Sequence, residues 1–370
     1  MAYAFVYVIF FLYLCTLFCV CIEKESKMIR ISFILPCKNV GIYIQKCLDS
    51  IYSIALREDE YEILCIDDGS QDATLDILKR NANSHTNLHV EQAQIDLGCG
   101  GGRNVLLRKA KGAYIWFIDP DDTVVSAEVA PIIRQAETNA LDVLLFNYYE
   151  VTEDGQKTIQ NPRFPDTYVM DGLSLWDTIF LERIVAHIGY VWRFLVRREY
   201  LNSIGLVFPE RIIHQDTVWM PKLMIKATRI QSTSIAAYDY WHHKTSITGV
   251  FDSVYPARSI YTRCITICQM VLNFAKELDN LKKSNARYEY YAKIFQNFAV
   301  SHYLNGLPIM LCRTSNKERK KFYSITKTEG VPAEVAAKER GLTMMCLNPV
   351  IGYVFSSILS MGYKLTHKRR

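Results

Sequence analysis

The sequence lacks the cysteine spacings that mark zinc sites and disulfide frameworks. Its 11 cysteines include no CxxC pair and no cluster with histidine, which excludes the common structural zinc modules. A thiol inside an apolar or helical run acts as a small hydrophobe. Six cysteines lie in such runs: Cys37, Cys47, Cys65, Cys264, Cys268 and Cys312. The cysteines therefore indicate a reducing compartment.

Internal repeats, long polar tracts and concentrated basic stripes are also missing. The net charge of +5 is small for 370 residues, and the basic residues are spread along the chain, so no nucleic-acid partner is expected. Half of the residues are hydrophobic, enough for one sizeable core and a smaller second one.

The N-terminus carries the longest apolar run. Residues 2–22 contain no charge, and about 20 apolar residues span a bilayer core. Lys24, Lys27 and Arg30 follow, which predicts a membrane anchor at 1–27 in the inner (cytoplasmic) membrane, with the remaining chain in the cytoplasm. The alternative is that translation starts at Met28, where the globular pattern begins.

From residue 28, short apolar runs alternate with amphipathic stretches. This pattern is typical of an α/β fold with a mostly parallel sheet. We expect one domain over 28–250, divided into halves at 28–150 and 151–250, and a helical region over 251–370. Its apolar stretch at 342–363 and basic tail suit a membrane surface; an ordinary core helix is the alternative.

Two acidic clusters follow buried strands. Asp67 and Asp68 end one strand, and Asp119, Asp121 and Asp122 end another. Ligands bind at the carboxyl ends of strands in open α/β sheets, so both clusters should face one crevice. A divalent cation such as Mg²⁺ or Mn²⁺ would offset their mutual repulsion and hold a substrate phosphate. The alternative is that these residues only cap helices and turns.

Several motifs lie in a specific order. They are residues 31–36 (ISFILP), 67–72 (DDGSQD), 102–104 (GRN), 110–112 (AKG) and 114–122 (YIWFIDPDD). The set resembles family 2 glycosyltransferases of the GT-A fold, densely from about residue 28 to 149 and sparsely to about 248. The resemblance implies an α/β GT-A domain whose first half binds a nucleotide sugar and whose second half binds the acceptor.

The resemblance also implies roles for single residues. Asp119 and Asp121 match the family's DxD, which makes both metal ligands. Nine further residues match donor-binding positions: Pro36, Asn39, Asp67, Asp68, Arg103, Asp122, His242, Lys244 and Ser246; Asp119 reaches the donor as well. Asp67 and Asp68 would lie beside the base and ribose, and Asp122 beside the donor sugar. For Arg103, a helix-start arginine paired with a nearby aspartate is the structural alternative.

Asp216 matches the family's catalytic base. A base carboxylate removes the proton of the acceptor hydroxyl as its oxygen attacks the anomeric carbon. Asp216 also precedes an amphipathic stretch, so it could cap that helix. The sequence departs from the family at Lys38, where an aromatic residue is usual, and at Gln215, where glutamate is usual.

Residues 98–102 (GCGGG) are interpreted as a loop that passes close to the donor before a helix beginning at Arg103. A dinucleotide fingerprint is excluded because the glycines follow the third strand with the wrong spacing.

Together these observations predict an inverting transferase that moves a hexose or N-acetylhexosamine from a nucleotide-diphosphate sugar, with UDP expected, to a bacterial polysaccharide or lipid-linked acceptor. Two alternatives stay open. One is a catalytically inactive, membrane-tethered assembly partner. The other is a nucleotidyltransferase, although the expected glycine-rich basic loop after the first strand is missing from residues 37–41.

Overall fold

The computed structural model describes residues 28–160, 163–181, 189–212, 215–243 and 266–296. The predicted anchor at 1–27 and the apolar stretch at 342–363 lie outside these residues. The described strands are β1 Ile31–Cys37, β2 Tyr61–Asp67, β3 Leu88–Gln92, β4 Tyr114–Phe117, β5 Thr123–Val124, β6 Val143–Val151, β7 Lys157–Ile159, β8 Phe194–Arg197 and β9 Ile230–Trp241. The α-helices are α2 Ile44–Tyr52, α3 Thr74–Ser84, α4 Gly98–Leu107, α5 Ser126–Thr138, α6 Gly172–Leu181, α7 Arg198–Ile204, α8 Asp216–Ile225 and α11 Cys268–Asn280, and short 3-10 turns lie at η1 Glu58–Glu60 and η3 Val191–Arg193.

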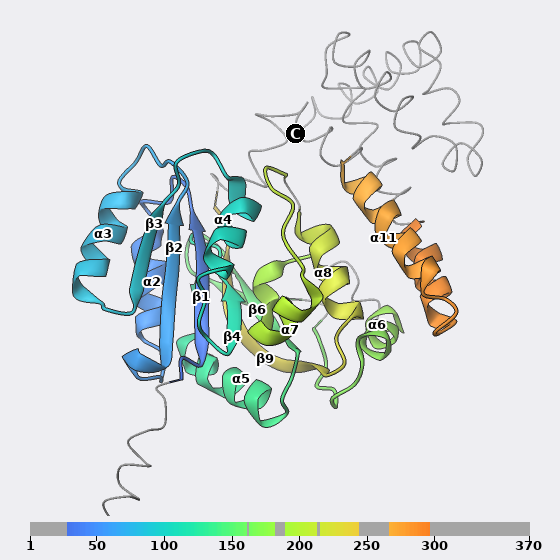
Figure 1. The fold of residues 1–370 in the computed structure, drawn as a ribbon. Helices are drawn as coiled ribbons and strands as arrows, with labels where there is room; N and C mark the ends of the chain where they lie inside the picture. Colours follow the sequence, from blue (N-terminus) through green and yellow to red (C-terminus); the bar gives the residue numbers. More distant parts are fainter. Residues whose placement is uncertain (1–27, 161–162, 182–188, 213–214, 244–265, 297–370) are drawn as a thin grey trace, which may run out of the picture.

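The strands form a single sheet within the described residues, with helices on both faces (Figure 1). The strand order is β3-β2-β1-β4-β8-β6-β9-β5, and β7 pairs with β6. The longest pairings are parallel, namely β1 with β2, β2 with β3 and β6 with β9. β8 is antiparallel to both β4 and β6. The sheet is therefore mostly parallel, as predicted, and the carboxyl ends of β1, β2, β4, β6 and β9 share one edge.

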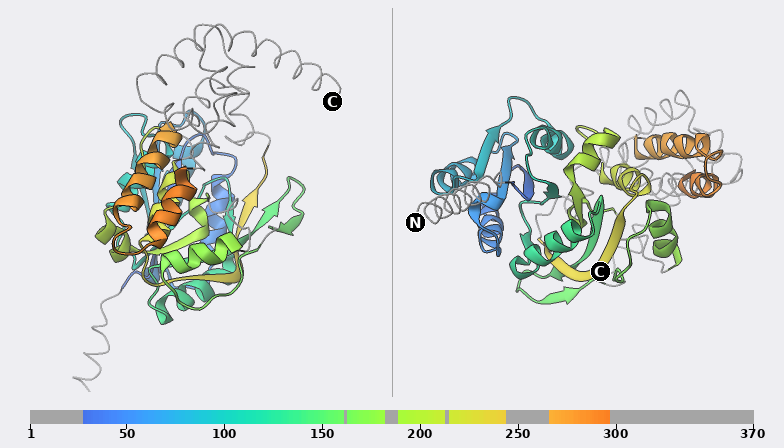
Figure 2. Two further views of the ribbon diagram at one scale, coloured as in Figure 1. Left: turned by 90° about the vertical axis from the view of Figure 1, so that its right-hand side faces the viewer. Right: turned by 60° about the horizontal axis from the view of Figure 1, so that its bottom comes forward.

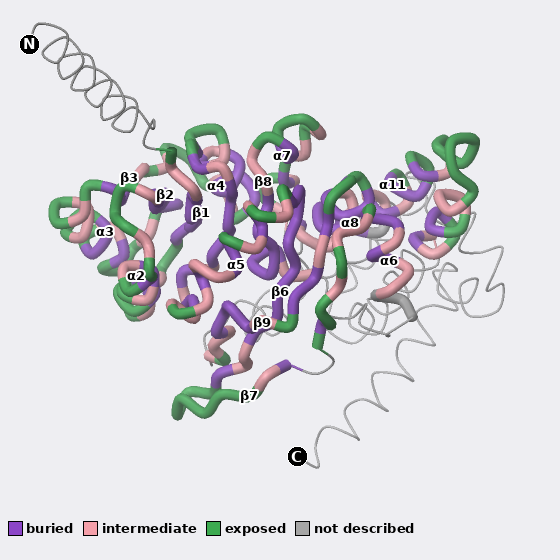
Figure 3. The backbone as a smooth tube through the Cα atoms, turned by 90° about the horizontal axis from the view of Figure 1, so that it is seen from below, coloured by how far each residue is buried: buried purple, intermediate pink, exposed green. Residues whose placement is uncertain are grey.

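Side chains alternate between the two faces of the sheet, as the period of a strand requires. On β4, Ile115 and Phe117 join the core beneath α4, α7 and α8. Their neighbours Tyr114 and Trp116 join the core beneath α2, α3 and α5. Both faces are covered, which explains why the strands read as continuous apolar runs rather than alternating ones. In Figure 3 the central strands are buried along their length, and exposed backbone is concentrated in loops and outer helix turns.

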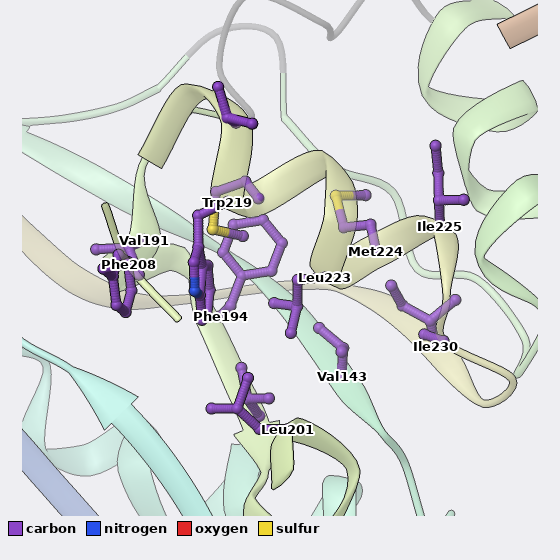
Figure 4. Close-up of a cluster of buried hydrophobic side chains, with 14 of the residues drawn as sticks. Val143, Val191, Phe194, Leu201, Phe208, Trp219, Leu223, Met224, Ile225 and Ile230 are labelled. Carbon is purple, nitrogen blue, oxygen red and sulfur yellow. The ribbon is translucent and has the colours of Figure 1, made fainter. Parts of the chain in front are cut away.

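The core around α8 joins the second half of the chain to the sheet. Trp219 stacks on Phe208 with ring centroids 4.2 Å apart, and Phe117 of β4 meets Trp219 edge-on at 5.5 Å. Figure 4 shows Trp219 and Phe208 beside Phe194 of β8. This packing fixes the start of α8, and thus Asp216, relative to the end of β4.

Helix α11 packs against α8 through Phe274 and Leu278, and Lys222 of α8 forms an ion pair with Glu277 at 2.9 Å. Figure 2 shows α11 on the outside of the molecule, beyond α8. Residues 287–296 are also helical, so the described part of the predicted C-terminal region is helical. Across the ranges that the structure describes, no helix is both long and apolar enough to cross a membrane.

The prediction of a loop at residues 98–102 is wrong, because α4 begins at Gly98 and includes all of them. Backbone crowding explains the glycines. A Cβ on Gly100 would lie 2.3 Å from the Pro209 carbonyl oxygen, and one on Gly102 would lie 3.1 Å from the Pro36 side chain. The missing side chains let α4 approach β1 and the 208–210 segment closely.

Candidate active site

The acidic residues singled out in the sequence lie at the carboxyl edge of the sheet. Cys37 at the end of β1 pairs with Asp67 at the end of β2. β4 is the other neighbour of β1 and leads directly into Asp119. The second half of the chain contributes the end of β9 and the start of α8. Segments more than 100 residues apart in sequence therefore meet at this edge.

Arg103 links the two predicted halves of the domain, residues 28–150 and 151–250. Its buried guanidinium donates from Nη2 to Asp119 Oδ1 at 2.7 Å. In the amide orientation that satisfies its neighbours, Gln215 accepts a hydrogen bond from Arg103 Nη1 at 2.9 Å and donates to the Ile212 carbonyl at 2.7 Å. The predicted alternative for Arg103, an ion pair with a nearby aspartate, is thus present. It positions Asp119 and the residue before Asp216 from one side chain.

Asp121 is partly exposed, and among the described residues no hydrogen bond joins its carboxylate to another side chain. Burial, together with the negative charge of Asp119, raises the pKa of Asp121 to about 6, and His243 opposes the shift. The carboxylate is therefore electrostatically unfavourable without a cation nearby.

Asp122 is buried and holds the loop in place. Its Oδ1 accepts the Trp241 N–H at 2.7 Å, and its Oδ2 accepts the Tyr238 hydroxyl at 2.9 Å. The same hydroxyl accepts the Asp119 N–H at 3.1 Å. Burial raises the pKa of Asp122 well above its ordinary value, with Asp121 and Asp119 adding to the shift. Asp122 thus ties the DxD loop to the end of β9. Its predicted contact with the donor sugar stays a prediction.

Replacing Tyr238 with phenylalanine should destabilise this loop. The change leaves one oxygen of buried Asp122 and the Asp119 N–H without their shared partner, which should lower the free energy of unfolding by about 2 kcal/mol. Denaturant unfolding of Tyr238→Phe measures the change. Tyr168→Phe, at a side chain that is 83% exposed, is the matched control. Equal stability of both variants would contradict this role.

Asp67 and Asp68 are buried at the end of β2 and hold neighbouring loops. Asp67 accepts the Ser70 N–H at 3.3 Å across a turn in which Gly69 has φ +75°. Asp68 accepts the N–H groups of Leu97 and Gly98 at 2.8 and 3.0 Å. Asp68 therefore caps α4. Their predicted contacts with the base and ribose stay predictions.

The loop after β1 lies against the Asp67 turn. Asn39, with φ +53°, donates its N–H to Ser70 Oγ at 2.9 Å and accepts the Gln71 N–H at 2.8 Å. Lys38 Nζ lies 2.9 Å from Asp96 and 3.6 Å from Asp68. Pro36 packs on α4 near Gly102. The family usually has an aromatic residue at this position. Here it is Lys38, whose ammonium group pairs with Asp96 and lies near Asp68.

Asp216 is the first residue of α8 and accepts the Thr217 N–H at 3.0 Å. Burial raises the pKa of Asp216 to about 6; Asp119 adds to the shift and Arg103 opposes it. These charges place Asp216 within electrostatic range of the DxD loop. A carboxylate with a raised pKa at the start of a helix, beside a cluster of polar groups, has the properties of a general base.

The two histidines after β9 have different partners. His242 Nε2 lies 3.6 Å from Glu150 Oε2, whereas the ring of His243 lies 3.0 Å from the Asp121 carbonyl oxygen. Thus His243, which was not selected from the sequence, is the histidine that contacts the DxD loop. The other predicted residues of this loop, Lys244 and Ser246, lie outside the described residues.

The side-chain chemistry of Asp119 and Asp121 suits a hard divalent cation, which prefers oxygen ligands. Both are carboxylates, and the raised pKa of Asp121 reflects uncompensated negative charge. Over the described part of the chain, no group of three or more His, Cys, Asp or Glu side chains is arranged to hold a metal by itself. Two carboxylates together with substrate phosphates match the usual mode of Mg²⁺.

The sequence did not point to Tyr238 or to the link between Arg103 and Gln215. Tyr238 lies within a long β9 strand and reads as one more β-forming aromatic residue. Its hydroxyl contacts residues 116 and 119 positions away. Its one local signal was its place three residues before the end of β9, a strand that ends at the edge carrying the acidic residues.

This architecture, an α/β sheet with a DxD loop at its carboxyl edge, defines the GT-A class of nucleotide-sugar transferases. Residues 32–205 match the model of "Glycosyl transferase family 2". The crystal structure of TarS from S. aureus superposes over 90% of this chain and 53% of its own chain, with a TM-score of 0.57 and 22% identity. That likeness establishes the GT-A fold.

Curated relatives match about 60% of the chain. The uncharacterized glycosyltransferases EpsJ of Bacillus subtilis and YibD of Escherichia coli are each 28% identical, over 221 and 222 residues. The matches cover 60% and 59% of this chain and 63% of each relative. The poly(ribitol-phosphate) beta-glucosyltransferase of Bacillus spizizenii is 29% identical over 216 residues, 58% of this chain and 32% of its own length. The matched region is therefore less than two thirds of these relatives.

Proposed function

We propose that the protein is an inverting glycosyltransferase that moves a hexose or N-acetylhexosamine from a nucleotide-diphosphate sugar, UDP being the expected nucleotide, to a glycan acceptor. The observation that carries this proposal is the meeting of Asp119 and Asp216 at Arg103, with Asp121 next to Asp119, at the carboxyl edge of the sheet. A structure of TarS from S. aureus is titled as a complex with UDP-GlcNAc, which supports UDP as the nucleotide.

The chemistry assigned to each residue follows from its position. Asp216 accepts the proton of the acceptor hydroxyl while that oxygen forms a bond to the anomeric carbon of the donor. The bond from that carbon to the diphosphate breaks, and the nucleoside diphosphate leaves with the electron pair. One displacement inverts the anomeric centre.

Asp119 and Asp121 would hold Mg²⁺ or Mn²⁺, which supplies positive charge for the departing diphosphate. Arg103 holds Asp119 in place through its hydrogen bond, and Tyr238 holds the loop through Asp122 and the Asp119 N–H. Both side chains act before the reaction, by fixing where carboxylates lie.

Purified protein, offered a panel of nucleotide sugars, should release nucleoside diphosphate from one donor. Release should be fastest with a UDP-sugar in the presence of Mn²⁺, and should increase when a membrane extract containing lipid-linked and polymeric acceptors is added. Coupled detection of UDP and GDP measures it. No release from any donor, with or without the extract, would support the inactive assembly partner instead. The membrane anchor at 1–27 stays a separate prediction.

A further inference from the structure

Five aromatic side chains gather beside the acidic loops. They come from β6, the segment before η3, η3 itself and β9, and are called the aromatic platform here: Tyr148, Tyr190, Trp192, Tyr238 and Tyr240. Trp192 stacks on Tyr238 with centroids 4.4 Å apart and 7° between ring planes, and Tyr190 stacks on Trp192 at 4.9 Å and 12°. Tyr240 lies nearly parallel to Trp192 at 5.5 Å.

The platform has a buried layer and an outer layer. Trp192 and Tyr238 are each at most 2% exposed, whereas Tyr190 and Tyr240 are partly exposed. Tyr148 meets Trp192 edge-on at 4.8 Å and supports the stack from the side. Aromatic rings held this way lose little conformational freedom when they bind a ligand. The outer layer is therefore a pre-organised surface of two rings, with centroids 6.1 Å apart and planes 30° apart.

Two contacts fix the platform at the edge of the sheet that carries the acidic loops. Trp116 of β4, just upstream of the DxD loop, donates its indole N–H to the Trp192 carbonyl at 2.8 Å. Tyr238 is the residue that binds Asp122. Tyr190 also lies within electrostatic range of Asp216, whose charge adds to the effect of burial in raising the pKa of the Tyr190 hydroxyl.

A polar pair borders the same surface. His242 meets Tyr240 edge-on at 5.1 Å, and its Nε2 lies 3.6 Å from Glu150 Oε2. The side chains of His242 and Glu150 are 51% and 44% exposed. An aromatic surface with a carboxylate and an imidazole beside it matches a sugar ring. The rings can contact the apolar C–H face of the sugar, and the two polar groups can bind the hydroxyls at its rim. An alkyl chain would make no use of the polar pair.

We propose that Tyr190 and Tyr240 form an acceptor subsite that binds a pyranose ring of a glycan, with its C–H face on the aromatic rings and its hydroxyls toward Glu150 and His242. The proposal rests on the proposed function, because the subsite is placed beside Asp216 as the base. It assigns the acceptor class: a chain containing pyranose sugars, rather than an acyclic polyol phosphate or a lipid tail.

Saturation-transfer NMR tests this binding without requiring turnover. Methyl β-D-glucopyranoside is the probe, and ribitol is the acyclic comparison. Both are measured in the presence of UDP, in a buffer that contains Mg²⁺ and no Mn²⁺. We expect transfer from aromatic protons to the ring C–H protons of the glucoside and little transfer to ribitol. Tyr190→Ala should reduce the glucoside signal about fivefold, whereas Tyr190→Phe keeps the ring and the signal.

Controls separate lost stacking from lost folding. Tyr190→Leu keeps apolar bulk but no flat ring and should behave like Tyr190→Ala, with circular dichroism unchanged. Tyr168→Ala removes a tyrosine that is 83% exposed and should have no effect. An unchanged signal in folded Tyr190→Leu, or equal transfer to ribitol, would refute the subsite.

The outcome is distinguishable from a failure of the proposed function. If a donor is found, the KM for the glucoside as acceptor should rise in Tyr190→Leu and stay near its wild-type value in Tyr190→Phe. Tyr168→Ala should leave both this KM and the slow hydrolysis of the donor in water unchanged. If no donor is turned over, the NMR experiment still decides whether the platform binds a pyranose ring. Equal losses of hydrolysis and transfer in folded Tyr190→Leu would contradict an acceptor role.

Discussion

Asp216→Asn should lower kcat for glycosyl transfer about a thousandfold, the scale of a lost general base. Asparagine has nearly the same shape and still offers an oxygen to the Thr217 N–H, the one hydrogen bond to another residue that the Asp216 carboxylate makes in the described structure. It cannot accept the proton of the acceptor hydroxyl. Steady-state kinetics with the donor found in the screen measures the loss.

The KM for the donor and the melting temperature should stay near their wild-type values, because the carboxylate lies on the acceptor side and α8 keeps its packing. Loss of donor binding in parallel with kcat would mean that Asp216 shapes the donor site instead. A kcat within a few-fold of wild type would exclude Asp216 as the base.

The pH profile of the wild type should report the same carboxylate. The pKa of Asp216 is raised to about 6, and the base acts only when ionised. Therefore kcat/KM should fall about tenfold per pH unit below pH 6 and level off above it. Since the pKa of Asp121 is also raised to about 6, the profile is measured at saturating Mn²⁺. In Asp216→Asn this acid limb should disappear.

Asp121→Ala has the second largest expected effect. It removes one of the two carboxylates assigned to the cation. The cation's positive charge, which would offset the negative charge of the leaving diphosphate, should be lost with it. We expect cation-stimulated turnover to fall at least about a hundredfold. Proton relaxation of water by Mn²⁺, in the presence of UDP, gives a readout independent of activity and should show weakened binding of the ion.

The fold should survive this change, because Asp121 is partly exposed and its carboxylate makes no hydrogen bond to another side chain within the described residues. Asp76→Ala, an exposed aspartate on α3, is the matched control and should change neither readout. Undiminished Mn²⁺ binding in Asp121→Ala would remove Asp121 from the cation site.

Regular elements were predictable wherever a local pattern decided them. The alternation of short apolar runs and amphipathic stretches corresponds in the structure to buried strands such as β1, β2 and β4 and to helices such as α2 and α5. Strand and helix periods depend on neighbouring residues, so the sequence alone predicts them. Helix α4 was placed too late. Its glycines look like a loop by propensity, but tertiary packing on Pro36 and Pro209 requires them in a helix.

The acidic motifs were visible in the sequence because each directly follows an apolar run, and parallel pairing then predicts that they share one edge of the sheet. The sequence did not predict which groups each carboxylate contacts. Asp68 caps α4, Asp122 binds Tyr238 and Trp241, and His243 rather than His242 reaches the DxD loop. These contacts depend on how β9 and α4 close on the first half of the sheet.

By itself the sequence determined the α/β alternation, the acidic residues at the strand ends and the family. Those features follow from hydrophobic periods and short motifs, which neighbouring residues carry. Only the tertiary structure decided that Arg103 bonds to both Asp119 and Gln215 and that the aromatic rings of η3 and β9 stack on one another. Arg103 and Gln215 lie about 110 positions apart, and Trp192 and Tyr238 about 50, so these contacts form only when folding offsets a loop-closure entropy that no local pattern records.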